Sequence, residues 1–197
     1  RRDNGLDYAP EQIIMTSGAK HAVFNALAAL INPGDEVIIP APYWVTYPEL
    51  VKWLGGCPVF VQAGIENDFK ITAAQLEAAV TERTKAILIN NPCNPTGSVY
   101  TRDELAALAK VIVEKDIYCI SDEVYEYFVY NGAFTSIACF EGMPERSIVI
   151  NGFSKSHCMT GWRIGYDAAP APIAKIIGKI QGQATHHPSN IAQYAAL

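Results

Sequence analysis

Short apolar runs alternate with helix-like segments along most of this chain of 197 residues, and this alternation limits the possible folds more than any other feature. The apolar runs are residues 36–40, 58–62, 85–90, 117–121 and 146–150. The helix-like segments are residues 17–31, 48–54, 72–80 and 101–115. Continuous apolar strands that alternate with helices are typical of a mostly parallel sheet covered on both faces. The sequence therefore predicts an α/β fold with three layers, α/β/α.

Two of the expected helices begin with a capping box. Thr72 is followed three residues later by Gln75, and Thr101 by Glu104. In this motif the threonine side chain accepts from a backbone N–H group and the longer side chain accepts in return. Both positions therefore mark helix starts. The end of the chain, IAQYAAL, has the spacing of an amphipathic helix.

Three chemically unusual stretches each follow a predicted strand directly. NNPCNPTG covers residues 90–97, Asp122 and Glu123 come after the strand at 117–121, and Lys155 follows the strand at 146–150. In sheets of this kind, ligands bind outside the carboxyl ends of the strands. We therefore expect the three stretches to meet at one edge of the sheet and to form one site.

Lys155 lies among small and polar residues in NGFSKSHCMTGWRIGY, residues 151–166, and Arg163 follows it eight positions later. A solvated loop is one interpretation. The other is a partly buried amine, because loss of hydration disfavours the charged form and makes lysine a nucleophile toward carbonyls. The arginine would supply a fork of donors for a phosphate.

The other two strand-end stretches carry groups suited to a planar ring. Asp122 is able to bind a ring nitrogen and keep it protonated, or simply to cap the next turn. Tyr125 and Asn94 are able to donate to a ring oxygen. Trp44, after the strand at 36–40, would stack on the ring or pack in the core.

A phosphate site is also expected at the start of the helix over residues 17–31. In SGAK, residues 17–20, the backbone N–H groups of Gly18, Ala19 and Lys20 would be unpaired and would point outward. Thr16 or Ser17 is the expected cap of this helix, and a plain cap without a ligand is the alternative.

Composition argues against several other functions. The net charge is −5 with no basic block, which argues against nucleic-acid binding as the main function. No apolar run approaches the roughly 20 residues of a membrane span. The five cysteines include no C-x-x-C pair, and the four histidines lack metal-ligand spacing, so we expect no disulfide framework and no metal. We expect a cytoplasmic protein.

An aldehyde that carries a phosphate, a ring nitrogen and a ring oxygen would satisfy all of these groups, and pyridoxal 5′-phosphate is such a molecule. At this point the motifs NPCNPTG, SDEVYE, SK-x7-R and the weaker SGAK show a resemblance over essentially all 197 residues. The chain resembles the fold-type-I pyridoxal-phosphate enzymes, specifically class I/II aminotransferases. Through PYWVTYP and MTGWRIGY it is most similar to the bacterial aspartate and aspartate/prephenate branch.

The resemblance implies a role for each residue. Lys155 would form the Schiff base with the cofactor and move the proton at the substrate alpha carbon. Asp122 would pair with the pyridinium nitrogen, while Asn94 and Tyr125 would bind the ring oxygen. Trp44 would stack on the ring, and Trp44 and Asn94 would contact the substrate. The phosphate would be held by the remaining residues, which are Gly18, Ala19, Lys20 and Arg163, with Ser154 orienting the lysine or the phosphate.

The resemblance also implies partners and shows departures. The reaction would transfer an amino group between an L-amino acid, aspartate or another dicarboxylic one, and a 2-oxo acid, in a homodimer with the site at the interface. Gly152 stands where some relatives have a phosphate-binding serine, and His186 and His187 occupy a region that often contacts the neighbouring subunit. No stretch matches the carboxylate-binding arginine or the N-terminal arm. We therefore expect residues 1–197 to be part of a large cofactor domain.

Three alternatives remain. A lyase or decarboxylase would use the same cofactor residues, because substrate groups select which bond breaks. A regulator that senses the cofactor would need a DNA-binding domain upstream. The motif S-x-x-K at residues 17–20 also occurs in penicillin-recognising enzymes, but the chain lacks the companion S-D-N and K-T-G motifs.

Overall fold

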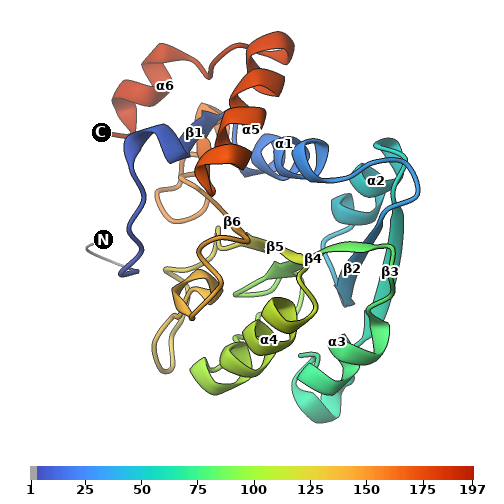
Figure 1. The fold of residues 1–197 in the computed structure, drawn as a ribbon. Coiled ribbons are helices and arrows are strands. Elements are labelled where there is room, and N and C mark those ends of the chain that lie inside the picture. The colour runs from blue at the N-terminus through green and yellow to red at the C-terminus, as the bar shows by residue number, and fades with distance from the viewer. Residues whose placement is uncertain (1–3) are drawn as a thin grey trace.

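The computed structural model describes residues 4–197 and contains one seven-stranded sheet in the order β1-β7-β6-β5-β4-β2-β3 (Figure 1). The strands are β1 (Ile13–Thr16), β2 (Glu36–Ala41), β3 (Cys57–Gln62), β4 (Thr84–Asn90), β5 (Tyr118–Asp122), β6 (Ser147–Gly152) and β7 (Gly165–Ala168). The helices are α1 (Ala19–Leu30), α2 (Thr46–Trp53), α3 (Ala73–Ala79), α4 (Arg102–Glu114), α5 (Ala171–Ala184) and α6 (Asn190–Ala195).

Helices cover both faces of the sheet, which confirms the predicted three layers. One core cluster joins α1, α2 and α5 to the sheet, and includes Leu27, Val51 and Ile177. A second cluster, on the opposite face, joins α3 and α4 to it, and includes Leu76 and Leu108. Strands β2 to β6 pair in parallel with each other. Their carboxyl ends therefore lie along one edge, and β4, β5 and β6 are direct neighbours there.

Local signals placed most elements within one or two residues. The capping boxes of α3 and α4 both form, and Thr72 and Thr101 accept hydrogen bonds from Gln75 N and Glu104 N. Helix α2 starts at Thr46, two residues before the expected start. The capping-box bonds of α3 and α4 join residues three positions apart, so the local sequence alone determines them.

The start of α1 differs from the expectation. Neither Thr16 nor Ser17 caps it; Gly18 is the N-cap residue, with φ of 83° and no side-chain cap bond. The Thr16 hydroxyl instead donates to the carbonyl oxygen of Gly18 at 3.2 Å. Because residue 18 has a positive φ, only glycine adopts this turn without strain.

Three elements were not expected from the sequence: β1, β7 and α5. Strands β1 and β7 have four residues each, and β7 includes Gly165 and Asp167, which are residue types depleted in strands. Strand β7 runs antiparallel to both of its neighbours, β1 and β6. Long-range pairing, rather than local preference, therefore produces this side of the sheet.

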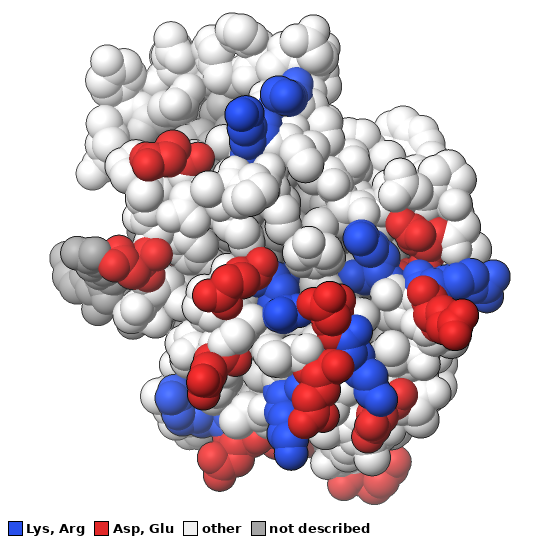
Figure 2. Space-filling model, viewed as in Figure 1, with Lys and Arg blue, Asp and Glu red and all other residues white. Residues whose placement is uncertain are grey.

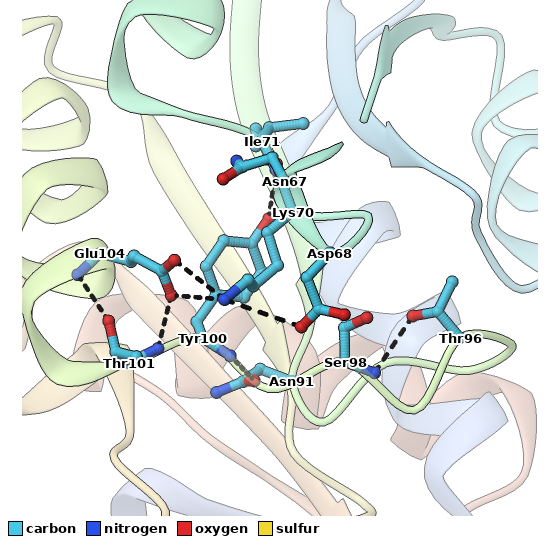
Figure 3. Close-up of polar contacts among 10 residues, drawn as sticks. All are labelled: Asn67, Asp68, Lys70, Ile71, Asn91, Thr96, Ser98, Tyr100, Thr101 and Glu104. Atoms are coloured by element: carbon cyan, nitrogen blue, oxygen red, sulfur yellow. Dashed lines mark hydrogen bonds and ion pairs between the residues drawn. The ribbon is translucent and has the colours of Figure 1, made fainter. Parts of the chain in front are cut away.

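A buried polar network fixes the loop after β4 to the start of α4 (Figure 3). The Lys70 ammonium lies 2.9 Å from Oε1 of Glu104, and Oε2 of the same carboxylate accepts from Thr101 N at 2.7 Å. The Tyr100 hydroxyl accepts from Ile71 N, and Tyr100 N donates to Asn91 Oδ1. The bond from Tyr100 therefore fixes Asn91, the first residue of the stretch NPCNPTG.

Charged side chains of both signs are interspersed on the face shown in Figure 2, mostly over its lower part, where α3 and α4 lie in Figure 1. Among residues 4–197, no helix combines the length and the apolar character needed to cross a membrane.

Candidate active site

A cavity of about 200 Å³ lies at the carboxyl ends of β4, β5 and β6, where the sequence predicted a site. Every predicted site residue except Gly18 contributes to its wall. The residues that line it are Ala19, Lys20, Trp44, Tyr47, Asn90, Asn94, Asp122, Val124, Tyr125, Ser154, Lys155, Thr160 and Arg163. The three strand-end stretches therefore meet in one cavity, as expected from the strand order.

Asp122 is the last residue of β5 and is buried. Its Oδ2 atom accepts a hydrogen bond from the Tyr47 hydroxyl at 2.7 Å, and its Oδ1 atom accepts from Val124 N at 3.3 Å. Burial raises the pKa of the Asp122 carboxyl to about 6, and the two hydrogen bonds oppose that increase. The carboxylate thus caps the turn and also faces the cavity, so both interpretations of this residue hold.

Asn94 and Tyr125 lie together on one side of the cavity. The Asn94 amide donates to the Tyr125 hydroxyl at 3.4 Å, and burial together with the Asp122 carboxylate raises the pKa of Tyr125. Asn90, at the end of β4, accepts from Asn94 N at 2.7 Å and donates to the Asp122 carbonyl at 2.9 Å. Asn90 therefore fixes the spacing between two predicted ligand residues.

Lys155 contributes to the cavity wall, but the expected burial of its side chain is wrong. The side chain is exposed, although the residue lines the cavity. Its ammonium makes no hydrogen bond or ion pair with any residue in 4–197. The amine is thus available to a ligand, and Lys20 and Arg163 provide further positive charge in the same cavity.

Arg163 lies across the start of α1. Its Nη1 donates to Thr160 O at 3.0 Å and its Nη2 approaches Ser17 O at 3.5 Å. A Cβ atom at residue 18 would be 2.9 Å from Arg163 Cζ, so Gly18 makes this approach possible. The arginine forms no ion pair within the described part of the chain. An anion at the helix start would satisfy both the guanidinium and the helix N–H groups.

Trp44 faces the cavity with its ring in contact with two other wall residues. The Lys20 ammonium lies 4.9 Å from the centre of the indole, and the Tyr47 ring meets it edge-on at 5.4 Å. These contacts hold the indole in place. One face of a planar ligand would therefore have an ordered aromatic partner.

The two departures from the family pattern also have positions in the structure. A Cβ atom on Gly152 would lie 3.2 Å from the carbonyl oxygen of Ile164 and 3.3 Å from Cα of Gly165, so the start of β7 leaves little room for a serine there. His186 and His187 lie between α5 and α6, with ring centres 5.2 Å apart. Neither of them lines the cavity.

Four wall residues were not predicted from the sequence: Tyr47, Asn90, Val124 and Thr160. Asn90 was detectable, because it ends β4 in the same way that Asp122 ends β5. Tyr47 is 75 residues from Asp122, and nothing local to it signals their contact. A larger hollow of about 1240 Å³ lies elsewhere, beside β1 and Tyr8. We assign the site to the smaller cavity because that cavity collects the lysine, the arginine and the buried aspartate.

Known proteins with similar sequences are aminotransferases. The family model "Aminotransferase class I and II" matches residues 1–197. The chain is 52% identical to an aspartate/prephenate aminotransferase from Cereibacter sphaeroides and 50% identical to an aspartate aminotransferase from Bacillus subtilis. Each match covers 100% of this chain but 50% and 51% of those relatives, so the chain spans about half of their length.

Solved structures of aminotransferases have the same fold as this chain. A variant of aspartate aminotransferase from Thermus thermophilus superimposes with a TM-score of 0.97 at 44% identity, covering 100% of this chain and 53% of the other. An aromatic aminotransferase from Pyrococcus horikoshii gives 0.96 at 43% identity, covering 99% and 52%. Enzymes of this class depend on pyridoxal phosphate. The chain therefore belongs to the class I and II aminotransferases.

Proposed function

We propose that the protein containing this chain is a pyridoxal-phosphate-dependent aminotransferase. One observation carries the proposal: Lys155, Asp122 and Arg163 line a single cavity of about 200 Å³. An amine, a buried acid and a guanidinium match the aldehyde, the ring nitrogen and the phosphate of the cofactor. We further propose that the described residues form part of the cofactor-binding large domain.

The donors present in the cavity fit the cofactor. Gly18 and Arg163 form a cradle that an added Cβ atom would fill, and the N–H groups of Ala19 and Lys20 begin α1 there. Asp122 has lone pairs left on both oxygens after its bonds with Tyr47 and Val124. The phosphate would thus lie at the start of α1, and the ring nitrogen would lie toward the end of β5.

When bound, pyridoxal phosphate supplies an electron sink that stabilises negative charge at the substrate alpha carbon. The residues of the protein hold the ring atoms in place and move a proton. Asp122 holds the proton at the ring nitrogen, and Asn94 and Tyr125 hold the ring oxygen. Lys155 is free of protein partners within residues 4–197 and is the group that moves a proton at the alpha carbon. We propose that Ser154, its neighbour in the sequence, orients the lysine or the phosphate.

We propose aspartate or another dicarboxylic amino acid, with a 2-oxo acid, as the substrates. The names of the relatives from Cereibacter and Bacillus support this choice. Trp44 and Asn94 would border the substrate. We also propose a homodimer, supported by Val45, which is 73% exposed beside Trp44. The cysteines of the described chain are unpaired, which supports a reducing, cytoplasmic location.

The test uses the full-length protein with added pyridoxal phosphate. We expect an absorption band from the bound cofactor that Lys155→Ala abolishes and that Lys179→Ala, an exposed lysine on α5, leaves unchanged. With aspartate and 2-oxoglutarate we expect oxaloacetate and glutamate. No band in the wild type would refute the cofactor assignment. Pyruvate or alanine as the product would refute amino-group transfer and favour a lyase or decarboxylase.

A further inference from the structure

The carboxylate of Asp122 has one side-chain hydrogen-bond partner among the described residues, and that partner is Tyr47. The tyrosine hydroxyl donates to Oδ2 at 2.7 Å, whereas the bond from Val124 N to Oδ1 is longer, at 3.3 Å. Tyr47 is 2% exposed and Asp122 is 4% exposed, so water does not compete with this bond. The hydroxyl is therefore the strongest single stabiliser of the carboxylate form of Asp122.

The surroundings of Tyr47 hold it in this role. The residue lies in the first turn of α2, packs in the core cluster shared with α1, and meets Trp44 edge-on at 87°. Burial raises the pKa of Tyr47 well above its ordinary value, and the Asp122 carboxylate raises it further. The phenol is therefore protonated at neutral pH and acts as a hydrogen-bond donor there.

The other ionisable groups near Asp122 do not replace this bond. Those that line the same cavity are Lys20 on α1, Tyr125 after β5, and Lys155 and Arg163 after β6. Glu123 follows Asp122 and bonds instead with Ser121 and Ser136. The three cations are exposed to solvent, which screens their effect. None of these groups hydrogen-bonds the Asp122 carboxylate within residues 4–197.

We propose that Tyr47 is a positioning residue that keeps Asp122 ionised and directs its free lone pairs toward the cofactor ring nitrogen. The inference rests on the proposed function, since it assigns Tyr47 a task in binding that cofactor. An aspartate without this donor would hold its own proton more readily. A neutral aspartic acid would then fail to stabilise a protonated ring nitrogen.

The experiment uses the full-length protein and compares Tyr47→Phe with Tyr43→Phe. Tyr43 stacks on Phe60 and has no bond to Asp122, so its variant removes a phenol hydroxyl without touching the carboxylate. Phenylalanine keeps the ring and its packing in both cases. In the apoprotein, carboxyl carbon NMR should show the pKa of Asp122 rising by about one pH unit or more in Tyr47→Phe only.

Cofactor binding gives the second measurement. We expect the dissociation constant of pyridoxal phosphate to rise about tenfold in Tyr47→Phe, as follows from loss of a hydrogen bond to a charged group. In an Asp122→Asn background the same change should have almost no additional effect, because Tyr47 acts through the carboxylate. A purely structural role would weaken binding equally in both backgrounds.

Three outcomes would overturn the inference. If wild type binds the cofactor and Tyr47→Phe matches Tyr43→Phe in both measurements, the inference fails while the proposed function stands. It also fails if the effect persists undiminished with Asp122→Asn. If the wild type binds no cofactor, the proposed function and this inference are refuted together.

Discussion

Asp167 is the residue whose replacement should stabilise the protein most clearly. It lies in β7 with no exposed surface, and neither carboxylate oxygen has a hydrogen-bond partner among residues 4–197. Its strand neighbours are Ile14 and Ile150, which belong to the apolar layer under α1 and α5. Burial alone raises the pKa of Asp167 well above its ordinary value. We predict that Asp167→Ala is more stable than wild type.

The magnitude follows from two opposing effects. An unpartnered buried polar group costs about 1–3 kcal/mol, which alanine removes. The lost carboxyl leaves a void of roughly one water volume, about 30 Å³, and at about 24 cal/mol per Å³ this costs about 0.7 kcal/mol. The net gain near pH 4 is therefore about 0.3–2.3 kcal/mol.

The gain should increase with pH. The pKa of this carboxyl is higher in the folded state than in the unfolded state, where it is about 3.9. Below pH 4 both states are protonated and no pH-linked penalty exists. Above pH 4 the unfolded state releases the proton while the folded state retains it, so wild-type stability falls. The fall is about 1.4 kcal/mol per pH unit until the pH passes the folded-state pKa.

Urea denaturation of the full-length protein at pH 5 and pH 7.5 measures the effect. Asp167→Ala should exceed wild type at both values, and by more at pH 7.5. Asp167→Asn keeps the buried polar atoms and should remove only the pH dependence. Ser147→Ala is the matched control, because Ser147 is also buried and unpartnered within residues 4–197 but does not titrate. A difference between wild type and Asp167→Ala that does not change with pH would refute the reasoning.

Two further predictions concern the site and its support. Gly18→Ala should weaken binding of pyridoxal phosphate about tenfold or more, because the new Cβ atom would displace Arg163 and residue 18 has a positive φ; a fluorescence titration with the cofactor measures this, and unchanged affinity would contradict it. Glu104→Ala should destabilise the protein by about 1–3 kcal/mol, because it leaves the Lys70 ammonium, only 11% exposed, without its near partner and removes a helix cap. The control Glu114→Ala, whose partner Lys110 is exposed, should change the free energy of unfolding by less than about 0.5 kcal/mol in the same urea assay.

The sequence alone determined the elements that depend on nearby residues. The capping boxes at Thr72 and Thr101 form as predicted because each involves contacts within one helical turn. The apolar runs at 85–90 and 117–121 became buried central strands because neither has a polar face to expose. Parallel strands place their carboxyl ends at one edge, and for that reason Asn94, Asp122 and Lys155 were predictable as one group before any coordinates.

Tertiary structure decided the features that depend on distant residues. The bond between Tyr47 and Asp122 joins residues 75 positions apart, and no local pattern marks it. Insertion of β7 between β1 and β6 depends on pairing of short strands with weak strand preference. The exposure of Lys155 depends on how the loop after β6 packs against the rest of the folded chain. Sequence periodicity indicates which face of an element is buried. The distant side chain that contacts this face is determined only by the folded structure.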